Sequence, residues 1–122
     1  MPDSKSNVHN LRRARRRRVD GTVLVTDAMT DAVIGRLGNL SETGMLLIAA
    51  APLAEDALYQ LRYTLALSGG GQLPIEAGMH ALWQERNTGS GQAWVGLRVI
   101  ALSDDQLQPL RAWLDAPGAR YD

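Results

Sequence analysis

Six arginines lie within seven consecutive positions near the N-terminus, interrupted only by Ala14. An arginine side chain stays charged at physiological pH and can donate two parallel hydrogen bonds, so such a cluster favours a phosphate or the edge of a purine. The segment is therefore a candidate for binding an anionic nucleotide. Its arginines are Arg12, Arg13, Arg15, Arg16, Arg17 and Arg18.

A second group of polar residues follows in the segment Asn39-Leu40-Ser41-Glu42-Thr43-Gly44. Asn and Ser side chains can bond to the backbone of their own turn, and a glycine permits a positive φ or a close approach. The simpler interpretation is a well-formed β-turn. The functional interpretation is that Asn39 and Ser41 point outward and bond to a base or a sugar phosphate.

Short apolar runs separated by turn residues predict six β-strands after the arginine cluster. The clearest is 58–67, where Tyr59 to Leu67 alternate between apolar and polar side chains. In the last strand, Val95, Leu97 and Val99 are expected to face the core. The other strands are expected at 23–25, 32–37, 45–48, 73–83 and 94–100, with hairpin turns at 68–72 and 87–91.

The periodicity changes near the C-terminus, where 103–106 (Ser-Asp-Asp-Gln) predicts a capping box at the start of a helix. Leu107, Leu110 and Leu114 then form an apolar stripe with Trp113 beside it. Pro109 lies inside this stripe, so the helix is expected to begin late or to bend there. Together these elements predict a mainly β fold, a six-stranded antiparallel barrel with a C-terminal helix packed on it.

The formal net charge of zero hides two segments of opposite sign. Residues 1–19 carry seven basic residues and one acidic residue, while the remainder carries six basic and twelve acidic residues. The basic arm is therefore expected to lie against its own domain.

Composition and motifs also exclude several classes of function. The chain has no cysteine, which excludes disulfides and thiolate ligands. The N-terminus lacks the apolar stretch of a secretory signal, so we expect a cytoplasmic protein. His9 and His80 lack metal-ligand spacing, and no nucleophile elbow surrounds Ser41, so no metal, cofactor or catalytic residue is expected.

The arginine cluster and the polar turn together resemble the signature of the PilZ domain, the bacterial receptor module for cyclic di-GMP. Arg13 and Arg17 match its R-x-x-x-R motif, and twenty-two residues later the segment from Asn39 to Gly44 matches (D/N)-x-S-x-x-G. The resemblance continues through Leu82-Trp83 and the strand after Trp94 to the terminal helix. It therefore covers nearly the whole chain.

The resemblance implies a PilZ domain over residues 11–115, a flexible arm at 1–10 and a C-terminal tail at 116–122. It implies a cyclic di-GMP receptor or adaptor without enzymatic activity, which orders its arginine-rich arm over the barrel and relays the signal to a protein partner. The implied ligand residues are Arg12, Arg13, Arg17, Asn39, Ser41 and Gly44, with Arg16, Arg18 and Trp83 as accessory candidates.

The register of the first motif stays open. Arg12 and Arg16 have the same spacing as Arg13 and Arg17. Aligning Arg18 with the arginine–hydrophobic step of the family leaves no arginine at the first motif position. In the Arg13 register, a basic residue at Arg12 is compatible with a stacked ligand dimer.

Two other functions fit the sequence. A small barrel with a basic arm can bind RNA or DNA through the phosphates, which would make binding steeply dependent on salt. A degenerate PilZ domain would bind only a protein partner.

Overall fold

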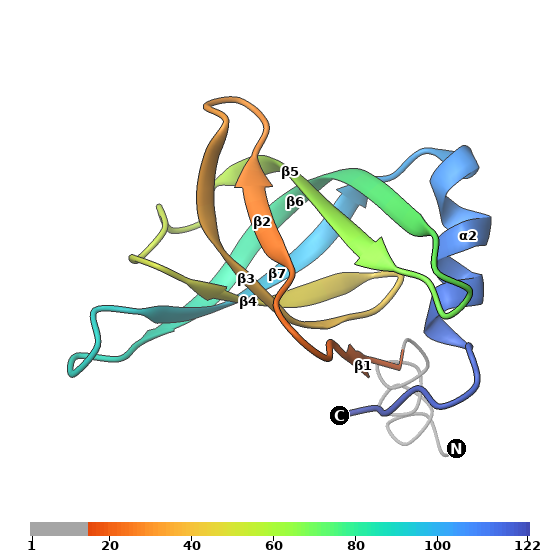
Figure 1. Ribbon diagram of the computed structural model, residues 1–122. Coiled ribbons are helices and arrows are strands. Elements are labelled where there is room, and N and C mark those ends of the chain that lie inside the picture. The colour runs from red at the N-terminus through yellow and green to blue at the C-terminus, as the bar shows by residue number, and fades with distance from the viewer. Residues whose placement is uncertain (1–14) are drawn as a thin grey trace, which may run out of the picture.

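The computed structural model describes residues 15–122, coloured in Figure 1. This part of the chain holds seven strands and one helix. They are β1 (Arg17–Arg18), β2 (Leu24–Asp27), β3 (Ala32–Leu40), β4 (Gly44–Ala49), β5 (Leu58–Ala66), β6 (Gln72–Arg86), β7 (Ala93–Ala101) and α2 (Asp104–Leu114).

Six of the strands close into an antiparallel barrel. The strand order is β1-β3-β2-β5-β6-β7-β4, and β3 also pairs with β4, which closes the six strands from β2 to β7 into a ring. Closure removes the free edges that six short strands would otherwise expose. The predicted barrel is confirmed, with one addition: β1 pairs with the end of β3 from outside the barrel.

The predicted alternation along the strands is confirmed by burial. On β5, Leu61, Tyr63 and Leu65 are buried in the core, while the residues between them are exposed. On β7, Val95 and Leu97 are buried, and Val99 is partly buried against the same core. The barrel interior is thus filled with apolar side chains, so any polar ligand must bind on its outer face or at its ends.

Two strands, β3 and β6, end three residues later than the sequence predicts. Strand β3 includes Asn39 and Leu40, which pair with β4, so the connection between the two strands shrinks to residues 41–43. Strand β6 continues to Arg86 because it pairs with β5 along its first part and with β7 along its second. In both cases the ladder of the neighbouring strand continues past the apolar run.

The helix begins at Asp104 and continues through Pro109, so the predicted late start is wrong. Pro109 is exposed, and its missing N–H costs only one backbone bond, while buried Leu110, Trp113 and Leu114 follow it and pack against the barrel. Figure 1 shows α2 beside the barrel and the chain after it turning back to β1.

The predicted capping box is wrong in its hydrogen bonds, although the helix begins at the position that the box predicted. Ser103 is the N-cap residue, but its hydroxyl makes no cap bond to the helix. Instead, the Gln106 side chain donates to Ser103 Oγ at 2.8 Å and exchanges hydrogen bonds with the backbone of Glu76. Gln106 thereby ties the first turn of α2 to β6.

Within residues 15–122, no helix is both long and apolar enough to cross a membrane.

Candidate nucleotide-binding site

Strand β1 brings the arginine cluster to the polar turn. It pairs antiparallel with the end of β3, with Arg17 opposite Leu40 and Arg18 opposite Asn39. Because successive side chains of a strand point to opposite faces, Arg17 and Arg18 diverge and only one of them lies on the Asn39 side. Arg12 and Arg13, two of the expected ligand residues, lie outside the described residues.

Ser41 organises the turn between β3 and β4. Its Oγ accepts hydrogen bonds from the backbone N–H of Thr43 at 3.2 Å and of Gly44 at 3.1 Å. Its own N–H donates to the Gly44 carbonyl at 2.9 Å. The functional interpretation expected Ser41 to point outward, but only 1% of its surface is exposed. Ser41 therefore stabilises the turn from its buried side.

Gly44 is required by a close approach and not by an unusual backbone angle. Its φ is not in the positive range. A Cβ placed on Gly44 would lie 2.6 Å from the backbone oxygen of Leu97, on the neighbouring strand β7. The glycine therefore lets the first residue of β4 pair tightly with β7, opposite Arg98.

Asn39 faces the outer side of the barrel wall. A β-bulge shifts the register between Leu37 and Asn39. The pairs Leu37–Leu47 and Leu40–Met45 on either side point into the core, so Asn39, next to Leu40, and its partner Leu46 point out. Nevertheless, only 5% of Asn39 is exposed. The cover comes from the C-terminal residues, where Asp122 Oδ2 accepts a hydrogen bond from Asn39 Nδ2 at 2.6 Å.

The amide of Asn39 has one unused group. Its Oδ1 is buried and has no hydrogen-bond partner among residues 15–122. The orientation of the amide follows from its neighbour, because an ionised carboxylate only accepts and the atom facing Asp122 must be the nitrogen. Asn39 therefore has an acceptor oxygen without a donor, whereas buried polar atoms are normally hydrogen-bonded.

The Asp122 carboxylate joins Asn39 to the arginine cluster. Arg18 Nε donates to Asp122 Oδ1 at 2.5 Å. The hydrogen bonds from Arg18 and then from Asn39 lower the pKa of Asp122, so the carboxylate is ionised at neutral pH. The same contact raises the pKa of Arg18. Of the described arginines, Arg18, expected only as an accessory residue, is thus the one that shares a hydrogen-bond partner with Asn39.

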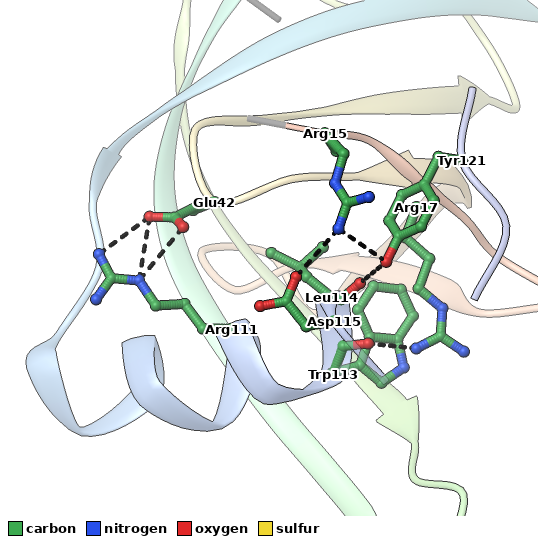
Figure 2. A network of polar contacts seen from close by, with 8 residues as sticks. All are labelled: Arg15, Arg17, Glu42, Arg111, Trp113, Leu114, Asp115 and Tyr121. Carbon is green, nitrogen blue, oxygen red and sulfur yellow. Dashed lines mark hydrogen bonds and ion pairs between the residues drawn. The ribbon is translucent and has the colours of Figure 1, made fainter. Parts of the chain in front are cut away.

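Arg17 is directed away from this group and toward the helix. Its guanidinium lies 4.1 Å from the centre of the Trp113 ring and donates to the Trp113 carbonyl (Figure 2). A guanidinium over an indole gains cation–π attraction as well as the hydrogen bond. In this structure Arg17 therefore belongs to the contact between β1 and α2.

Two further contacts connect the site to the helix, and Figure 2 shows both. Arg15 lies over the Tyr121 ring and reaches Asp115 at 3.4 Å. Glu42, inside the polar turn, accepts hydrogen bonds from Arg111 of α2 at 3.1 to 3.3 Å. The contacts of Arg15 with Asp115 and of Arg18 with Asp122 agree with the predicted attraction between the basic arm and the acidic domain.

Trp83 shares the outer face with Asn39 but lies further along the barrel wall. The register connects them through Leu46 on β4 and Gly96 on β7. Gly96 has no side chain, and the half-exposed Trp83 ring occupies that space, with Nε1 2.2 Å from where a Cβ would be. Three strand spacings of about 4.8 Å separate the two residues along the curved wall, which is half-way round the closed six-stranded barrel.

Sequence reasoning missed two residues of this site. Arg98 is exposed opposite Gly44, beside the polar turn. Alternation along β7 already placed it on the outer face, but only the pairing of β7 with β4 brings it to the turn. Asp122 was assigned to a tail, and the opposite charges of arm and body were the only signal for its contact with the arginines.

Within the described residues, no three His, Cys, Asp or Glu side chains gather as metal ligands would.

The profile of the PilZ domain matches residues 10–116 of this chain. Among solved structures, the chain is similar to the Bacillus subtilis inhibitor of motility, MotI/DgrA, with a TM-score of 0.66 and 16% identity over 84% of this chain. It covers 48% of that protein, so it spans about half the length of this neighbour.

A second similar structure is the PilZ domain of YcgR from Escherichia coli, solved with c-di-GMP. Its TM-score is 0.57 and its identity 16%, over 82% of this chain and 86% of that one. Such identities show a shared fold. No curated protein matches the chain. The matched residues 10–116 include the arginine cluster, the polar turn, every barrel strand and α2, and the chain therefore belongs to the PilZ domain family.

Proposed function

We propose that this chain is a receptor for cyclic di-GMP, which binds on the outer face of the barrel between β1 and the turn from Asn39 to Gly44. Family membership and the c-di-GMP-bound PilZ domain of YcgR support this ligand at the level of the family. The observation that carries the proposal for this chain is the β1–β3 register, which sets Arg18 opposite Asn39.

The chemistry of the ligand matches the groups that this register brings together. Cyclic di-GMP carries two phosphates and two guanines. An arginine can pair with O6 and N7 of a guanine through two parallel hydrogen bonds, or can hold a phosphate. The free Oδ1 of Asn39 offers an acceptor for a guanine N–H. Arg18 and Asn39 could therefore supply donor and acceptor to one purine.

Ser41 and Gly44 act in this proposal by shaping the turn and not by direct contact. The buried Ser41 hydroxyl holds the N–H of Gly44, and Gly44 lets β4 approach β7. This keeps the outward Asn39 and Arg98 on one stretch of the wall, two strands apart with β4 between them. Exposed Arg98 adds a further guanidinium at the edge of the proposed site.

We assign the remaining arginines of the cluster to contacts that the arm makes with the ligand. Arg12, Arg13 and Arg16 would add contacts from the arm as it becomes ordered over the barrel on binding. Arg17 would join them only by leaving Trp113. The motif registers that end at Arg17 and at Arg18 thus predict different costs of binding, because Arg18 already faces Asn39.

We propose that binding is passed to a protein partner through α2 and the ordered arm, without a catalytic step. The contact between Glu42 and Arg111 joins the ligand turn to α2. A ligand that shifts the turn would therefore disturb a contact on the helix surface, where a partner could detect it. The ligand shifts this helix contact only to the extent that it binds two arrangements of the turn with different affinity.

Calorimetric titration with cyclic di-GMP tests the proposal. Arg18→Ala is expected to weaken binding by about 1–3 kcal/mol, the range for an arginine that reads a guanine. The matched control is Arg62→Ala, which removes an exposed arginine of β5 that pairs with Asp31 and lies outside the site. Arg17→Ala and Arg13→Ala then establish which register contributes to binding.

Two further titrations separate the alternatives. A guanine-specific site rejects cyclic di-AMP, and its affinity depends only moderately on salt, whereas binding of RNA or DNA through phosphates falls steeply with salt. Absence of saturable binding at tens of micromolar cyclic di-GMP would refute the proposed function. Equal affinities for the Arg18 and Arg62 variants would refute the proposed position of the site.

A further inference from the structure

The C-terminal residues form a short antiparallel pairing with the arginine cluster. Tyr121 forms a β-bridge with Arg17. On either side of it, the N–H of Arg18 donates to the Arg120 carbonyl at 2.8 Å, and the N–H of Asp122 donates to the Arg16 carbonyl at 2.9 Å. The last residues therefore occupy the free edge of β1, at the entrance to the proposed ligand site.

Within this pairing, the Asp122 carboxylate accepts hydrogen bonds from Arg18 and Asn39, two residues of the proposed ligand site. One oxygen accepts from Arg18 and the other from Asn39, at 2.5 and 2.6 Å. A carboxylate presents two adjacent acceptor atoms, as do the O6/N7 edge of guanine and a phosphate, and both kinds of group pair bidentately with arginine. Asp122 and an anionic guanine nucleotide thus satisfy the same donors.

We propose that the segment 119–122 is an internal competitor that closes the cyclic di-GMP site, and that the ligand must displace Asp122 from Arg18 and Asn39. This inference rests on the proposed function and concerns the regulation of the same site. It makes the free chain a closed state whose opening is coupled to ligand binding.

The burial of Asn39 supports a closed state. Asn39 lies on the outer side of the barrel wall, yet it is only 5% exposed because the C-terminal segment covers it. Within the described part of the chain, its Oδ1 has no partner in the closed arrangement. The segment therefore covers the Asn39 amide and pairs its Nδ2 but not its Oδ1. This is expected for a side chain whose full set of hydrogen-bond partners is supplied by another molecule.

The segment 119–122 is also attached in a way that lets it move away from the site. It follows α2 through Pro117 and Gly118, and Gly118 has a φ of 84°, a conformation that favours glycine. Beyond this turn, Tyr121 is held by its hydroxyl bond to the Leu114 carbonyl and by the Arg15 guanidinium above its ring. Together with the backbone pairing to β1, the Asp122 bonds and the ion pair of Arg120 with Asp20, these contacts hold the segment closed, and none of its residues belongs to the apolar core.

The contacts are strong enough to close the segment and weak enough to release it. Arg18 and Asp122 keep 57% and 37% of their side-chain surface exposed, so water and salt moderate their attraction. A receptor that is mostly closed binds its ligand with an affinity reduced by the fraction of open molecules. Removing the competitor should therefore tighten cyclic di-GMP binding, by about fivefold for a surface contact of this kind.

The test compares Asp122→Ala with Asp115→Ala by calorimetry with cyclic di-GMP. Both variants remove one negative charge from the residues that follow α2, but Asp115 lies outside the segment 119–122, pairs with Arg15 and makes no contact with Asn39. Asp122→Ala is expected to bind about fivefold more tightly than the wild-type chain, and Asp115→Ala within about twofold of it. Equal tightening in the two variants would overturn the inference, since it would reduce the effect to net charge.

Hydrogen exchange provides the second measurement. In the free wild-type chain, the Asp122 amide is bonded to the Arg16 carbonyl and should exchange slowly. Saturating cyclic di-GMP should make it exchange faster, while the amides of the turn at 41–44 exchange more slowly. Binding that leaves the Asp122 amide protected would overturn the inference and leave the proposed function intact. Absence of binding in all three proteins would refute both.

Discussion

Substitution of the motif glycine by alanine tests whether close packing, and not backbone freedom, requires a glycine at position 44. Gly44 does not have a positive φ, so alanine can adopt its backbone conformation. The added Cβ would lie 2.6 Å from the Leu97 backbone oxygen, a distance that such atoms do not tolerate. Since that oxygen belongs to the β7 backbone, relief requires the β4–β7 ladder to shift.

The cost can be worked from this geometry. Overpacking that displaces backbone costs about 1–3 kcal/mol, so we take about 2 kcal/mol. For 122 residues, the entropy of unfolding is about 0.26 kcal/mol per kelvin. Gly44→Ala should therefore lower the melting temperature by about 8 °C. It should also weaken cyclic di-GMP binding, because the shifted ladder moves Arg98 and the turn.

Thermal unfolding followed by circular dichroism measures this effect, with Gly69→Ala as the control. Gly69 lies in the hairpin between β5 and β6, and a Cβ there would meet no atom within 4 Å. Its replacement should change stability by less than about 0.5 kcal/mol. Equal melting temperatures for the two variants would refute the claim that the approach to Leu97 selects glycine at position 44.

The remaining predictions concern the turn, the helix contact and acid. Ser41→Ala should destabilise the chain by about 1–2 kcal/mol in urea unfolding and should also weaken ligand binding, because the Gly44 N–H loses its acceptor; unchanged stability would contradict the role of the hydroxyl in the turn. Arg111→Ala should cost less than about 1 kcal/mol in the same assay, since its partner Glu42 is only partly buried and the pair is near the surface; a larger loss would show that this contact holds α2 in place. The hydrogen bonds that lower the pKa of Asp122 stabilise the closed segment at neutral pH and are lost as the pH falls through that lowered value. Because amide exchange is itself base-catalysed, the quantity to measure is the protection of the Asp122 amide, its exchange rate relative to that of an unstructured amide at the same pH. This protection should be lost only in acid, below the usual carboxyl pKa, and its loss near neutral pH would contradict this assignment.

Much of the barrel could be predicted from the sequence because buried and exposed side chains alternate along its clearest strands, above all β5. Leu61, Tyr63 and Leu65 on β5 are buried with polar residues between them, so the period of two was visible without any knowledge of partners. The two-residue strand β1 was missed because arginines have no apolar pattern, and only its pairing with β3 makes it a strand. The capping box failed for a similar reason, since Gln106 bonds to β6, which lies thirty residues away in the sequence.

The candidate site was predicted in its composition but not in its arrangement. The motifs identified Asn39, Ser41 and Gly44, and spacing alone linked them to the arginines. Which arginine meets Asn39 depends on the β1–β3 register, and the structure places Arg18 there while Arg17 contacts Trp113. The burial of Ser41 also required the turn to be seen, because a serine oxygen that accepts local N–H groups has the same sequence as one that faces a ligand.

The most direct test of the proposed site is a titration of isotopically labelled protein with cyclic di-GMP, followed by backbone amide chemical shifts. The largest saturable shifts are expected at 16–18, 39–44 and 119–122, the three segments that meet at Arg18 and Asn39. Shifts confined to another surface, such as the cavity between Leu53 and Trp83, would place the ligand elsewhere and contradict the account.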